Sequence, residues 1–475
     1  MIYLIRRAVP VQLPLPEIIN TARPNKMTFR WISCLLIPVL LIGCQEQKSD
    51  ENIVVIGGGL MGSAAAWQLA RQGEQVLLLE QQDSIYTFGS SFGDARISRA
   101  LGPRNDLFTY LQQRSVQETQ QLLDFLAEKS GQTQSMDEIY HTSPVTYIYY
   151  NSEKMAFDQL VKNQSIPTEY ATNADDAKTK FDLSVPDSAL VIREINPYSG
   201  TLNPRVLIHK MQEGFRLAGG TIRFRHRVTQ LIRTDDGFEL EVENLGDGSK
   251  VTIHAARVVS AAGPYNGQLL KDIAPYVSEL IHPQRVFLNY FKIDPQVYQS
   301  LTGEQKAKFQ DYFPVADMTP EIMYAMVEKW DPDGSPVLKI GGHYLRQDIT
   351  NLDNVWQKEV SSTEVAWGRD HLARYLQQLH LPITGENLIK TGAHSCVYSL
   401  TRTETPYVCS LMNLDKRQDP NLVLVGGMSG IGAKGTLTYG LIAANILLGK
   451  EDPAPIYHQA TYALGFQHLI SDLKE

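Results

Sequence analysis

The sequence predicts an α/β protein in which a parallel sheet covered by helices is interrupted by a second domain with a mixed, largely antiparallel sheet. The first observation is residues 53–80, which read as an apolar strand, a glycine-rich turn, a helix and a second apolar strand. The second is 421–450, where strand, glycine turn and helix return near the end of the chain. Between them, strand-like runs dominate 286–390. This order predicts one domain assembled from separated segments around an insertion.

The first glycine-rich turn has the spacing of a dinucleotide-binding fingerprint. Gly57, Gly59 and Gly62 supply G-x-G-x-x-G, and Glu80 ends the second strand near the distance expected for an acid that binds a ribose. The glycines let the backbone approach a pyrophosphate, whose charge faces the N-terminus of the following helix. A purely structural turn is the alternative, but the complete unit favours a Rossmann-type dinucleotide site. The fingerprint alone leaves open whether FAD or NAD(P) binds.

The composition is that of an ordinary globular protein. The chain has 475 residues, 43% of them hydrophobic and 20% charged, which is enough for two or three lobes with substantial cores. Its formal net charge of −8 argues against a nucleic-acid partner. No Cys/His cluster has ligand spacing, so no metal site is predicted. The chain has four cysteines, Cys34, Cys44, Cys396 and Cys409. These are too few for a disulfide framework.

The first fifty residues read as a targeting segment. Arg30 precedes a short apolar stretch over 31–42, which suits the core of a secretory signal better than a membrane span. The stretch leads into Leu-Ile-Gly-Cys at 41–44, which resembles the bacterial lipoprotein processing box. We therefore expect a start at Met27, a lipid anchor at Cys44 and a location in the bacterial envelope facing the periplasm. The alternatives are a simple membrane anchor or a misassigned extension, which would leave the protein cytoplasmic.

The remaining sequence alternates between the two predicted domains. Residues 152–195 look helical and polar and carry no motif. Helices are expected over 106–129, 204–217 and 362–379, and strands over 144–150, 221–225, 238–243 and 251–260. The expected parts are 1–50 for the N-terminal extension, 51–140, 199–285 and 391–475 for the cofactor domain, and 141–198 and 286–390 for the substrate domain.

The distribution of glycine-rich turns favours FAD over NAD. Such turns recur at 57–62, 89–93, 263 and 426–435. Each alone can serve a local turn, but one extended cofactor that crosses the molecule would use all of them. A nicotinamide dehydrogenase would normally keep its dinucleotide fold continuous at one end of the chain, and it stays as an alternative.

Five collinear segments carry motifs beyond the fingerprint: GSSFGDARISR (89–99), VVSAAGPYNGQLL (258–270), LKIGGHY (338–344), GAHSCVYS (392–399) and GMSGIGAKG (427–435). Together they resemble the monomeric sarcosine oxidase and N-methyltryptophan oxidase family of the D-amino-acid-oxidase superfamily. The resemblance covers nearly all of residues 51–450, and the collinear set is more specific than any one motif. It implies a glutathione-reductase-like FAD-binding Rossmann domain with an inserted substrate domain on a mixed or antiparallel sheet.

The resemblance implies that the flavin is covalently bound. In the family, the cysteine of the matching C-x-Y segment forms a thioether with a methyl group of the flavin ring, so Cys396 is the expected attachment point. A buried, inert cysteine is one alternative, and a disulfide with Cys409 is another. The expected cofactor-binding residues are Gly57, Gly59, Leu60, Met61, Gly62, Glu80, Ser90, Val228, Gly263, Cys396, Gly430, Gly432 and Lys434.

The same resemblance implies a clamp for the substrate. Arg99 and Lys434 match two cations that hold the substrate carboxylate and so orient the amine toward the flavin. Arg96 matches a flavin-side arginine that tunes the ring. Surface ion pairing is the alternative for all three, although a lysine at a helix start opposes the helix dipole.

Three more residues take catalytic roles by resemblance. Lys339 matches a lysine that helps oxygen accept electrons, because a fixed positive charge stabilises the negative charge that develops on oxygen. His343 matches an active-site histidine near the substrate carboxylate, and Tyr398 is expected to line the pocket. On general statistics Lys339 would lie on a solvated strand face, and His343 would be structural.

The sequence departs from the family in the substrate pocket. Ser91 and Phe92 stand where sarcosine oxidase carries a pair of histidines, and Ala95 replaces its threonine. Residues 319–329 do not reproduce the family's pocket tyrosine pattern. We therefore expect a bulkier N-alkyl or cyclic secondary amino acid rather than sarcosine itself.

The predicted activity is FAD-dependent oxidation of the C–N bond of a secondary amino acid by a monomeric enzyme. The product is an imine, and oxygen is reduced to hydrogen peroxide. One alternative is a membrane-tethered dehydrogenase that passes electrons to a quinone or carrier protein, which the lipoprotein segment favours. Another is a flavin- or ligand-binding lipoprotein without turnover.

Overall fold

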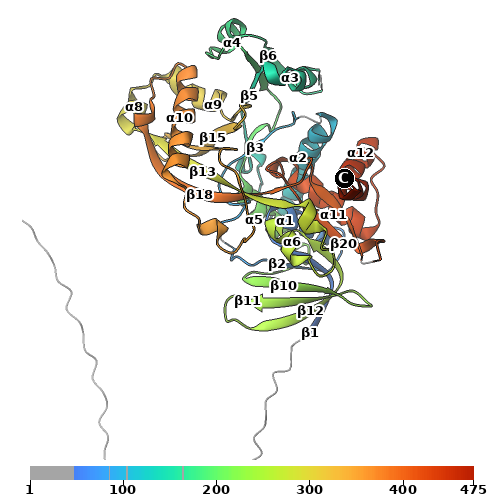
Figure 1. The fold of residues 1–475 in the computed structure, drawn as a ribbon. Helices are drawn as coiled ribbons and strands as arrows, with labels where there is room; N and C mark the ends of the chain where they lie inside the picture. The colour runs from blue at the N-terminus through green and yellow to red at the C-terminus, as the bar shows by residue number, and fades with distance from the viewer. Residues whose placement is uncertain (1–47, 85, 103–104, 163–164, 414, 475) are drawn as a thin grey trace, which may run out of the picture. The chain divides into compact units, whose positions relative to one another are not determined.

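The computed structural model describes residues 48–474 apart from 85, 103–104, 163–164 and 414. The predicted signal segment, the start at Met27 and the lipid anchor at Cys44 lie outside the described residues. Among the residues that are described, no helix is long and apolar enough to cross a membrane. Two large sheets, one small sheet and the helices packed on them make up this part of the chain (Figure 1).

The first large sheet has eight strands and contains the dinucleotide fingerprint. Its central strand β1 (Lys48–Ile56) pairs in parallel with β2 (Val76–Leu79) and with β12 (Lys250–Ser260). β12 also pairs in parallel with β20 (Gln418–Gly426), so segments far apart in the sequence form one layer. The other strands are β9 (Thr221–Arg223), β10 (His226–Arg233), β11 (Phe238–Asn244) and β19 (Tyr407–Met412).

This sheet is buried on both faces at its centre, because β1 is apolar at successive positions. Ile53 and Val55 pack with α1 (Leu60–Ala70) and α11 (Thr436–Leu448), whereas Val54 and Ile56 pack in a core on the other face. Ten of the eleven residues of α1 are buried, as its apolar sequence requires. A Cβ on Gly440 of α11 would lie 2.5 Å from the Ala64 carbonyl carbon, so small residues allow α1 and α11 to cross closely.

The second large sheet has nine strands and is organised around β13 (His282–Ile293). β13 pairs antiparallel with β16 (Pro336–Gly342) on one side and with β18 (Leu388–Leu400) over its whole length. Helix α10 (Ser362–Gln378) packs on this sheet beside β13 and β18 (Figure 1). The other strands are β5 (Val145–Tyr150), β6 (Thr168–Ala171), β7 (Ala189–Glu194), β14 (Val315–Asp317), β15 (Met323–Trp330) and β17 (Gln347–Asp348).

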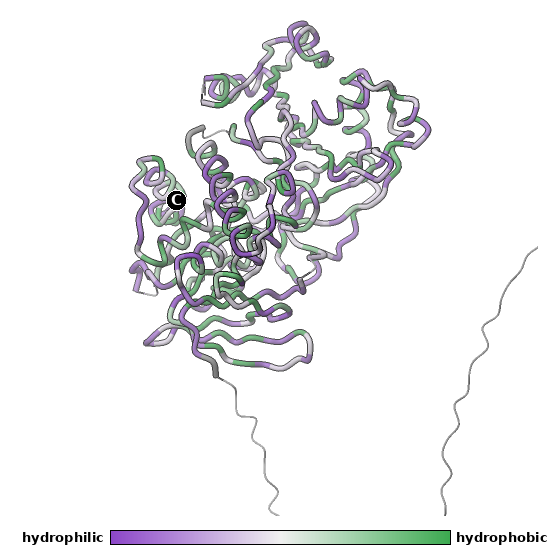
Figure 2. The backbone as a smooth tube through the Cα atoms, turned by 180° about the vertical axis from the view of Figure 1, so that it is seen from behind, coloured by the Kyte–Doolittle hydropathy of each residue, from purple (hydrophilic) through white to green (hydrophobic). Residues whose placement is uncertain are grey.

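A small sheet of three strands joins the predicted cofactor-domain parts 51–140 and 199–285. It contains β3 (Arg96–Ser98), β8 (Gly200–Leu202) and β4 (Tyr140–Thr142). The remaining helices are α2 (Asn105–Ser130), α3 (Lys154–Val161), α4 (Ala174–Phe181), α5 (Pro204–Leu217), α6 (Asn266–Leu269), α7 (Val277–Leu280), α8 (Pro295–Ser300), α9 (Gly303–Asp311), α12 (Pro455–Leu464) and α13 (Phe466–Lys474). Hydrophobic and polar residues alternate along much of the chain (Figure 2), as expected for elements that each bury one side.

The structure corrects three expectations about the elements. Residues 152–195 are not one helical region: they contain α3, α4 and the strands β6 and β7, and β7 reads ALVIRE with almost continuous burial. β10 was not expected, because its alternating exposed and half-buried residues give a weak strand signal. β18 lies in the second sheet, so the segment that begins at 391 starts inside a strand of that sheet rather than in the cofactor domain.

Candidate active site

The predicted site residues converge on one cavity of about 1260 Å³. The cavity is larger than an ordinary small-molecule pocket, which measures roughly 300–1,000 Å³. Gly62 does not line it: a Cβ at that position would lie 1.7 Å from the Gly57 carbonyl oxygen, so Gly62 is required for the turn to close. The predicted residues that do line it are Gly57, Gly59, Leu60, Met61, Glu80, Ser90, Arg96, Arg99, Val228, Gly263, Lys339, His343, Cys396, Tyr398, Gly430, Gly432 and Lys434.

The glycine turn after β1 forms the first part of the wall. Gly57 has a φ of +96°, and its N–H donates to the Leu79 carbonyl at 2.8 Å. A Cβ on Gly57 would lie 2.5 Å from the Ala261 carbonyl oxygen, so only glycine fits between β1 and the end of β12. The turn leads into α1, whose first N–H groups face an anion in a site of this type.

Glu80 lies at the end of β2 with its carboxylate in the same wall. It accepts hydrogen bonds from the Gly58 N–H at 2.6 Å and the Gln82 N–H at 2.7 Å. Burial raises the pKa of Glu80, and these hydrogen bonds oppose the rise. Val228 and Gly263 line the cavity from β10 and from the turn after β12. A glycine cradle, a helix start and a buried acid in one cavity fit the dinucleotide portion of FAD.

Lys339 is buried on β16, and its side chain is paired. Its exposed fraction is 1%, and its ammonium group donates to the Glu328 carboxylate and to the Ala95 carbonyl. Glu328, on β15, also accepts from the N–H groups of Asp94 at 2.7 Å and Ala95 at 3.2 Å. Burial lowers the pKa of Lys339 to about 8, although Glu328 opposes the fall. Lys339 is therefore not on a solvated strand face.

Arg96 holds the glycine loop of residues 89–93 to the start of β3. Its guanidinium donates to the Ala95 carbonyl at 2.8 Å, to the Ser90 carbonyl at 3.2 Å and to the Phe92 carbonyl. Arg96 therefore donates to backbone carbonyls of the loop. This differs from the surface ion pair that was the alternative from the sequence. The Ser90 hydroxyl donates to the Val397 carbonyl at 2.7 Å, which ties the same loop to β18.

A second pair of cations lies in another part of the cavity. Lys434, just before α11, is 2% exposed, and its ammonium nitrogen has no hydrogen-bond partner among the described residues. It lies 3.9 Å from the centre of the Phe108 ring. Burial and the charge of Arg99 lower the pKa of Lys434 well below its usual value. The Arg99 guanidinium lies 5.5 Å from the centre of the Tyr147 ring.

A fully buried carboxylate organises the surroundings of these cations. Glu194, at the end of β7, accepts from the Ala100 N–H at 2.7 Å, the Leu101 N–H at 3.2 Å and the Tyr147 hydroxyl at 3.0 Å. It therefore joins the second sheet to the segment that follows Arg99. Its oxygens accept from these neutral donors rather than from Lys434, and its charge opposes only part of the fall in the pKa of Lys434.

Tyr398 and His343 line the cavity from the second sheet. The Tyr398 hydroxyl donates to the Tyr324 hydroxyl at 3.0 Å, and the His343 and Tyr398 rings meet edge to face with centroids 6.1 Å apart. Burial, and to a lesser degree the charge of Arg346, lowers the pKa of His343 to about 4. His343 is therefore neutral at pH 7 and can offer one donor and one acceptor.

Cys396 lies on β18 and is a free, buried thiol that lines the cavity. It packs with Val286 and Leu288 of β13 and with the Tyr324 ring. Burial raises the pKa of the thiol. The alternative of a disulfide with Cys409 is wrong, because Cys409 is also free and lies on β19 in the other large sheet.

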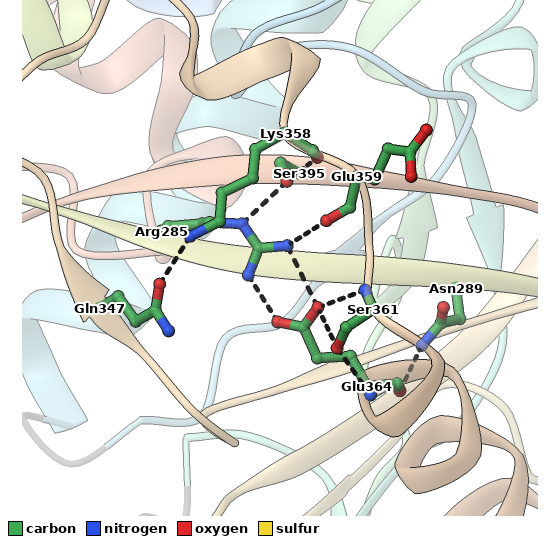
Figure 3. Close-up of polar contacts among 8 residues, drawn as sticks. All are labelled: Arg285, Asn289, Gln347, Lys358, Glu359, Ser361, Glu364 and Ser395. Atoms are coloured by element: carbon green, nitrogen blue, oxygen red, sulfur yellow. Dashed lines mark hydrogen bonds and ion pairs between the residues drawn. The ribbon is translucent and has the colours of Figure 1, made fainter.

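The strand that carries Cys396 is fixed by a buried polar cluster around Arg285 of β13 (Figure 3). The Arg285 guanidinium donates to both carboxylate oxygens of Glu364, to the Ser395 hydroxyl at 2.9 Å and to the Glu359 carbonyl at 3.2 Å. The Ser395 hydroxyl donates in turn to the Lys358 carbonyl at 2.6 Å. The cluster thus ties β13 and β18 to the start of α10, next to the thiol.

Sequence reasoning missed several residues of the site. Glu328 and Tyr324 lie on β15, where Tyr324, Met326 and Glu328 occupy alternate positions and so share one face. That alternation, in a segment that lacks the family's tyrosine pattern, is the sequence signal that identifies them. Phe108 and Glu194 lie outside every sequence motif described above, so the local sequence does not indicate that they belong to the site.

The comparisons with known proteins agree with this geometry. Residues 52–446 match the family model described as FAD dependent oxidoreductase. This enzyme belongs to that family, and the predicted resemblance and fold class are confirmed. N-methyl-L-tryptophan oxidase from Yersinia pestis (strain Pestoides F) is 24% identical over 417 residues, which are 86% of this chain and 97% of that protein.

Solved structures share the fold at low sequence identity. The open form of NikD, an amino acid oxidase, has a TM-score of 0.62 and 20% identity and covers 86% of this chain and 96% of its own. L-proline dehydrogenase from P. horikoshii has a TM-score of 0.63 and 16% identity, with coverage of 88% and 98%. Glycine oxidase from Geobacillus kaustophilus has a TM-score of 0.62 and 16% identity, with coverage of 85% and 96%.

Proposed function

We propose that this enzyme is an oxidase of secondary amino acids that converts the C–N bond of its substrate to an imine and reduces oxygen to hydrogen peroxide. The observation that carries the proposal is the buried ammonium of Lys434, which lacks a partner in the described chain and shares a cavity with Arg99 and a dinucleotide cradle. A carboxylate on the substrate would satisfy the donors of Lys434 and Arg99. The curated N-methyl-L-tryptophan oxidases support an N-alkyl amino acid as the substrate.

The residues of this chain then have separate tasks. Arg99 and Lys434 bind the carboxylate and fix the orientation of the amine. Neutral His343 and the Tyr398–Tyr324 hydroxyl pair offer hydrogen bonds to a polar group without adding charge. FAD would supply the redox chemistry: the carbon next to the amine nitrogen would lose a hydride to the flavin and the nitrogen would lose a proton, and the same two electrons and two protons would convert oxygen to hydrogen peroxide. Lys339 supplies a positive charge for that last transfer.

The rest of the lining favours a bulky apolar substituent on the substrate. Flexible methionine side chains adapt to irregular shapes and contribute no charge. A large N-alkyl group or a ring would bury well against such side chains, whereas the methyl group of sarcosine would contact few of them. The apolar residues that line the cavity include Phe108, Leu288, Ala316, Met318, Ile322 and Met326.

A peroxide-coupled screen of the full chain with N-methyl and cyclic amino acids tests the proposal. We expect peroxide release with bulky apolar secondary amino acids, and much less with sarcosine. Anaerobic bleaching of the flavin by the same compounds separates turnover from mere binding. Flavin that no amino acid bleaches would contradict the proposal and favour a flavin-binding lipoprotein.

A dehydrogenase that passes electrons to a quinone or carrier protein is a second candidate. It is favoured by the lipoprotein-like segment at 41–44, which would place the protein at a membrane that contains quinones. Under air, a dehydrogenase would reduce an added dye faster than it releases peroxide. The ratio of the two rates decides between the candidates.

We also propose covalent attachment of the flavin through Cys396, a lipid anchor at Cys44 and a monomeric protein in the bacterial envelope. The processing box at 41–44 supports the anchor. Expression of the full chain and of Cys44→Ser, followed by detergent partition and intact mass, tests it. A mature mass that still includes residues before Cys44 would contradict the anchor.

A further inference from the structure

Lys339 and Glu328 form a buried ion pair that neither the fingerprint nor the carboxylate clamp requires. Their exposed fractions are 1% and 8%. The carboxylate of Glu328 is held by two backbone N–H groups, those of Asp94 and Ala95, and the Ala95 carbonyl accepts from Lys339. The pair therefore joins the β15–β16 hairpin to the segment before β3, and the direction of the ammonium group is fixed by two acceptors.

Other charged and titratable groups face Lys339 from every element packed against it. Glu328 and Asp94 favour its charged form, whereas Arg96 and burial oppose it. Tyr290 lies directly opposite Lys339 in the pairing of β13 with β16, and His394 and Cys396 face it from β18. Burial together with Arg96 and Lys339 lowers the pKa of His394 to about 4, so His394 adds no charge at pH 7. Glu328 is thus the main group that counters the desolvation of Lys339.

We propose that Glu328 is a positioning residue that keeps the Lys339 ammonium protonated and directed at the Ala95 carbonyl, and so sets the pH range over which the reduced protein reacts with oxygen. The inference rests on the proposed function, because it takes Lys339 as the cation that assists oxygen. A lysine buried to this degree tends to lose its proton. The opposite charge of a carboxylate in direct contact reverses part of that tendency.

The direction of the effect follows from the causes of the pKa shift. With Glu328 present, burial lowers the pKa of Lys339 only to about 8. Without the carboxylate the pKa falls further, and Lys339 loses its charge at a lower pH. A carboxylate that only held the hairpin against residues 94–96 would change stability but would not move a pH profile.

The experiment follows the oxidation of the reduced holoprotein. The full-length protein is reduced with dithionite without oxygen and is mixed with aerated buffer between about pH 6 and pH 10, a range that brackets the lowered and ordinary lysine pKa. Flavin absorbance reports the rate. The absorbance spectrum of the oxidised protein over the same pH range gives a second readout without turnover.

In the wild type we expect the rate to fall with rising pH, with an inflection near pH 8. Glu328→Gln should move the inflection down by about one pH unit and lower the rate at pH 8 by about fivefold. Lys339→Met should remove the inflection and slow the reaction at every pH in the range.

Lys339→Arg should remove the inflection and keep the reaction fast, because a guanidinium does not titrate in this range. Glu304→Gln, at an exposed position of α9, is the matched control.

An inflection that Glu328→Gln leaves in place, or that survives in Lys339→Met, overturns the proposal. Should Glu328→Gln fail to fold, Glu328→Asp is expected to move the inflection in the same direction by less, and an unmoved inflection overturns the proposal there as well. Dithionite replaces the substrate in this experiment. A failure of the proposed amino acid activity would therefore appear in the peroxide screen and would leave this result interpretable.

Discussion

The ammonium nitrogen of Lys434 lies 3.9 Å from the centre of the Phe108 ring and has no hydrogen-bond partner among the described residues. A cation–π contact of this kind contributes about 2 kcal/mol when desolvated, which does not replace the water lost on burial. The arrangement costs stability in the free protein, and a bound anion would remove that cost.

Replacing Lys434 with methionine should therefore stabilise the protein and impair its activity. We expect the free energy of unfolding of the cofactor-free protein at pH 7 to rise by about 1–2 kcal/mol, as at other sites where function costs stability. Loss of one charge-assisted hydrogen bond, worth about 1.5–3 kcal/mol, should lower kcat/KM about 10- to 150-fold. Lys271→Met, at an exposed site, is the control for denaturation, and a destabilised Lys434→Met would contradict this account.

The same substitution should change the dependence of stability on pH. In the folded protein the pKa of Lys434 lies well below the ordinary value of 10.5. At pH values between the lowered pKa and 10.5, the unfolded state therefore binds more protons than the folded state. Stability should then rise with pH across this window. Urea denaturation at several pH values should show a smaller rise in Lys434→Met than in the wild type. Equal slopes would mean that Lys434 stays protonated throughout.

Gly62→Ala should destabilise the glycine turn without touching the cavity directly. The added Cβ would lie 1.7 Å from the Gly57 carbonyl oxygen, and neither backbone segment can move freely. We expect a loss of about 2–4 kcal/mol in the free energy of unfolding, together with weaker retention of FAD. In the matched control Gly303→Ala, the new Cβ meets nothing within 4 Å. Similar stabilities of the two variants would show that the turn relaxes more than the structure indicates.

Removing one partner of the Arg285–Glu364 pair should be costly, because the other charge would remain buried. Arg285→Met or Glu364→Gln should each lower the free energy of unfolding by about 3–5 kcal/mol. The double replacement with apolar residues should cost less than the sum of the single changes, since it leaves no buried charge. A double-mutant cycle by urea denaturation measures this coupling, and additive losses would contradict it.

Cys396→Ser should release the flavin on acid precipitation, whereas the wild type should retain it with the protein. Cys409→Ser is the matched control, because Cys409 is also buried but lies in the core of the first sheet. Absorbance of the supernatant and intact mass of the pellet measure the outcome. Flavin that washes off the wild type would overturn the thioether assignment.

The sequence predicted the parts of this molecule that depend on local patterns. Gly57, Gly62 and Glu80 follow from the spacing of one continuous unit, and α5 begins and ends where its apolar period predicts. The partners of Lys339 could not be predicted in the same way. Glu328 reaches Lys339 through a hairpin, and Ala95 reaches it from a segment 244 residues away along the chain. Such contacts depend on how the sheets pack, which no local pattern records.

The pairing of β12 with β20 also has a consequence for biosynthesis. Val258 of β12 lies opposite Leu422 of β20, and Lys434 follows this strand on the way to α11. While the ribosome has not yet released this C-terminal portion, the nascent chain lacks one wall of the cavity and the helix that packs against α1. The complete cofactor site can therefore form only after this C-terminal segment has been synthesised, although the glycine-rich fingerprint emerges from the ribosome much earlier.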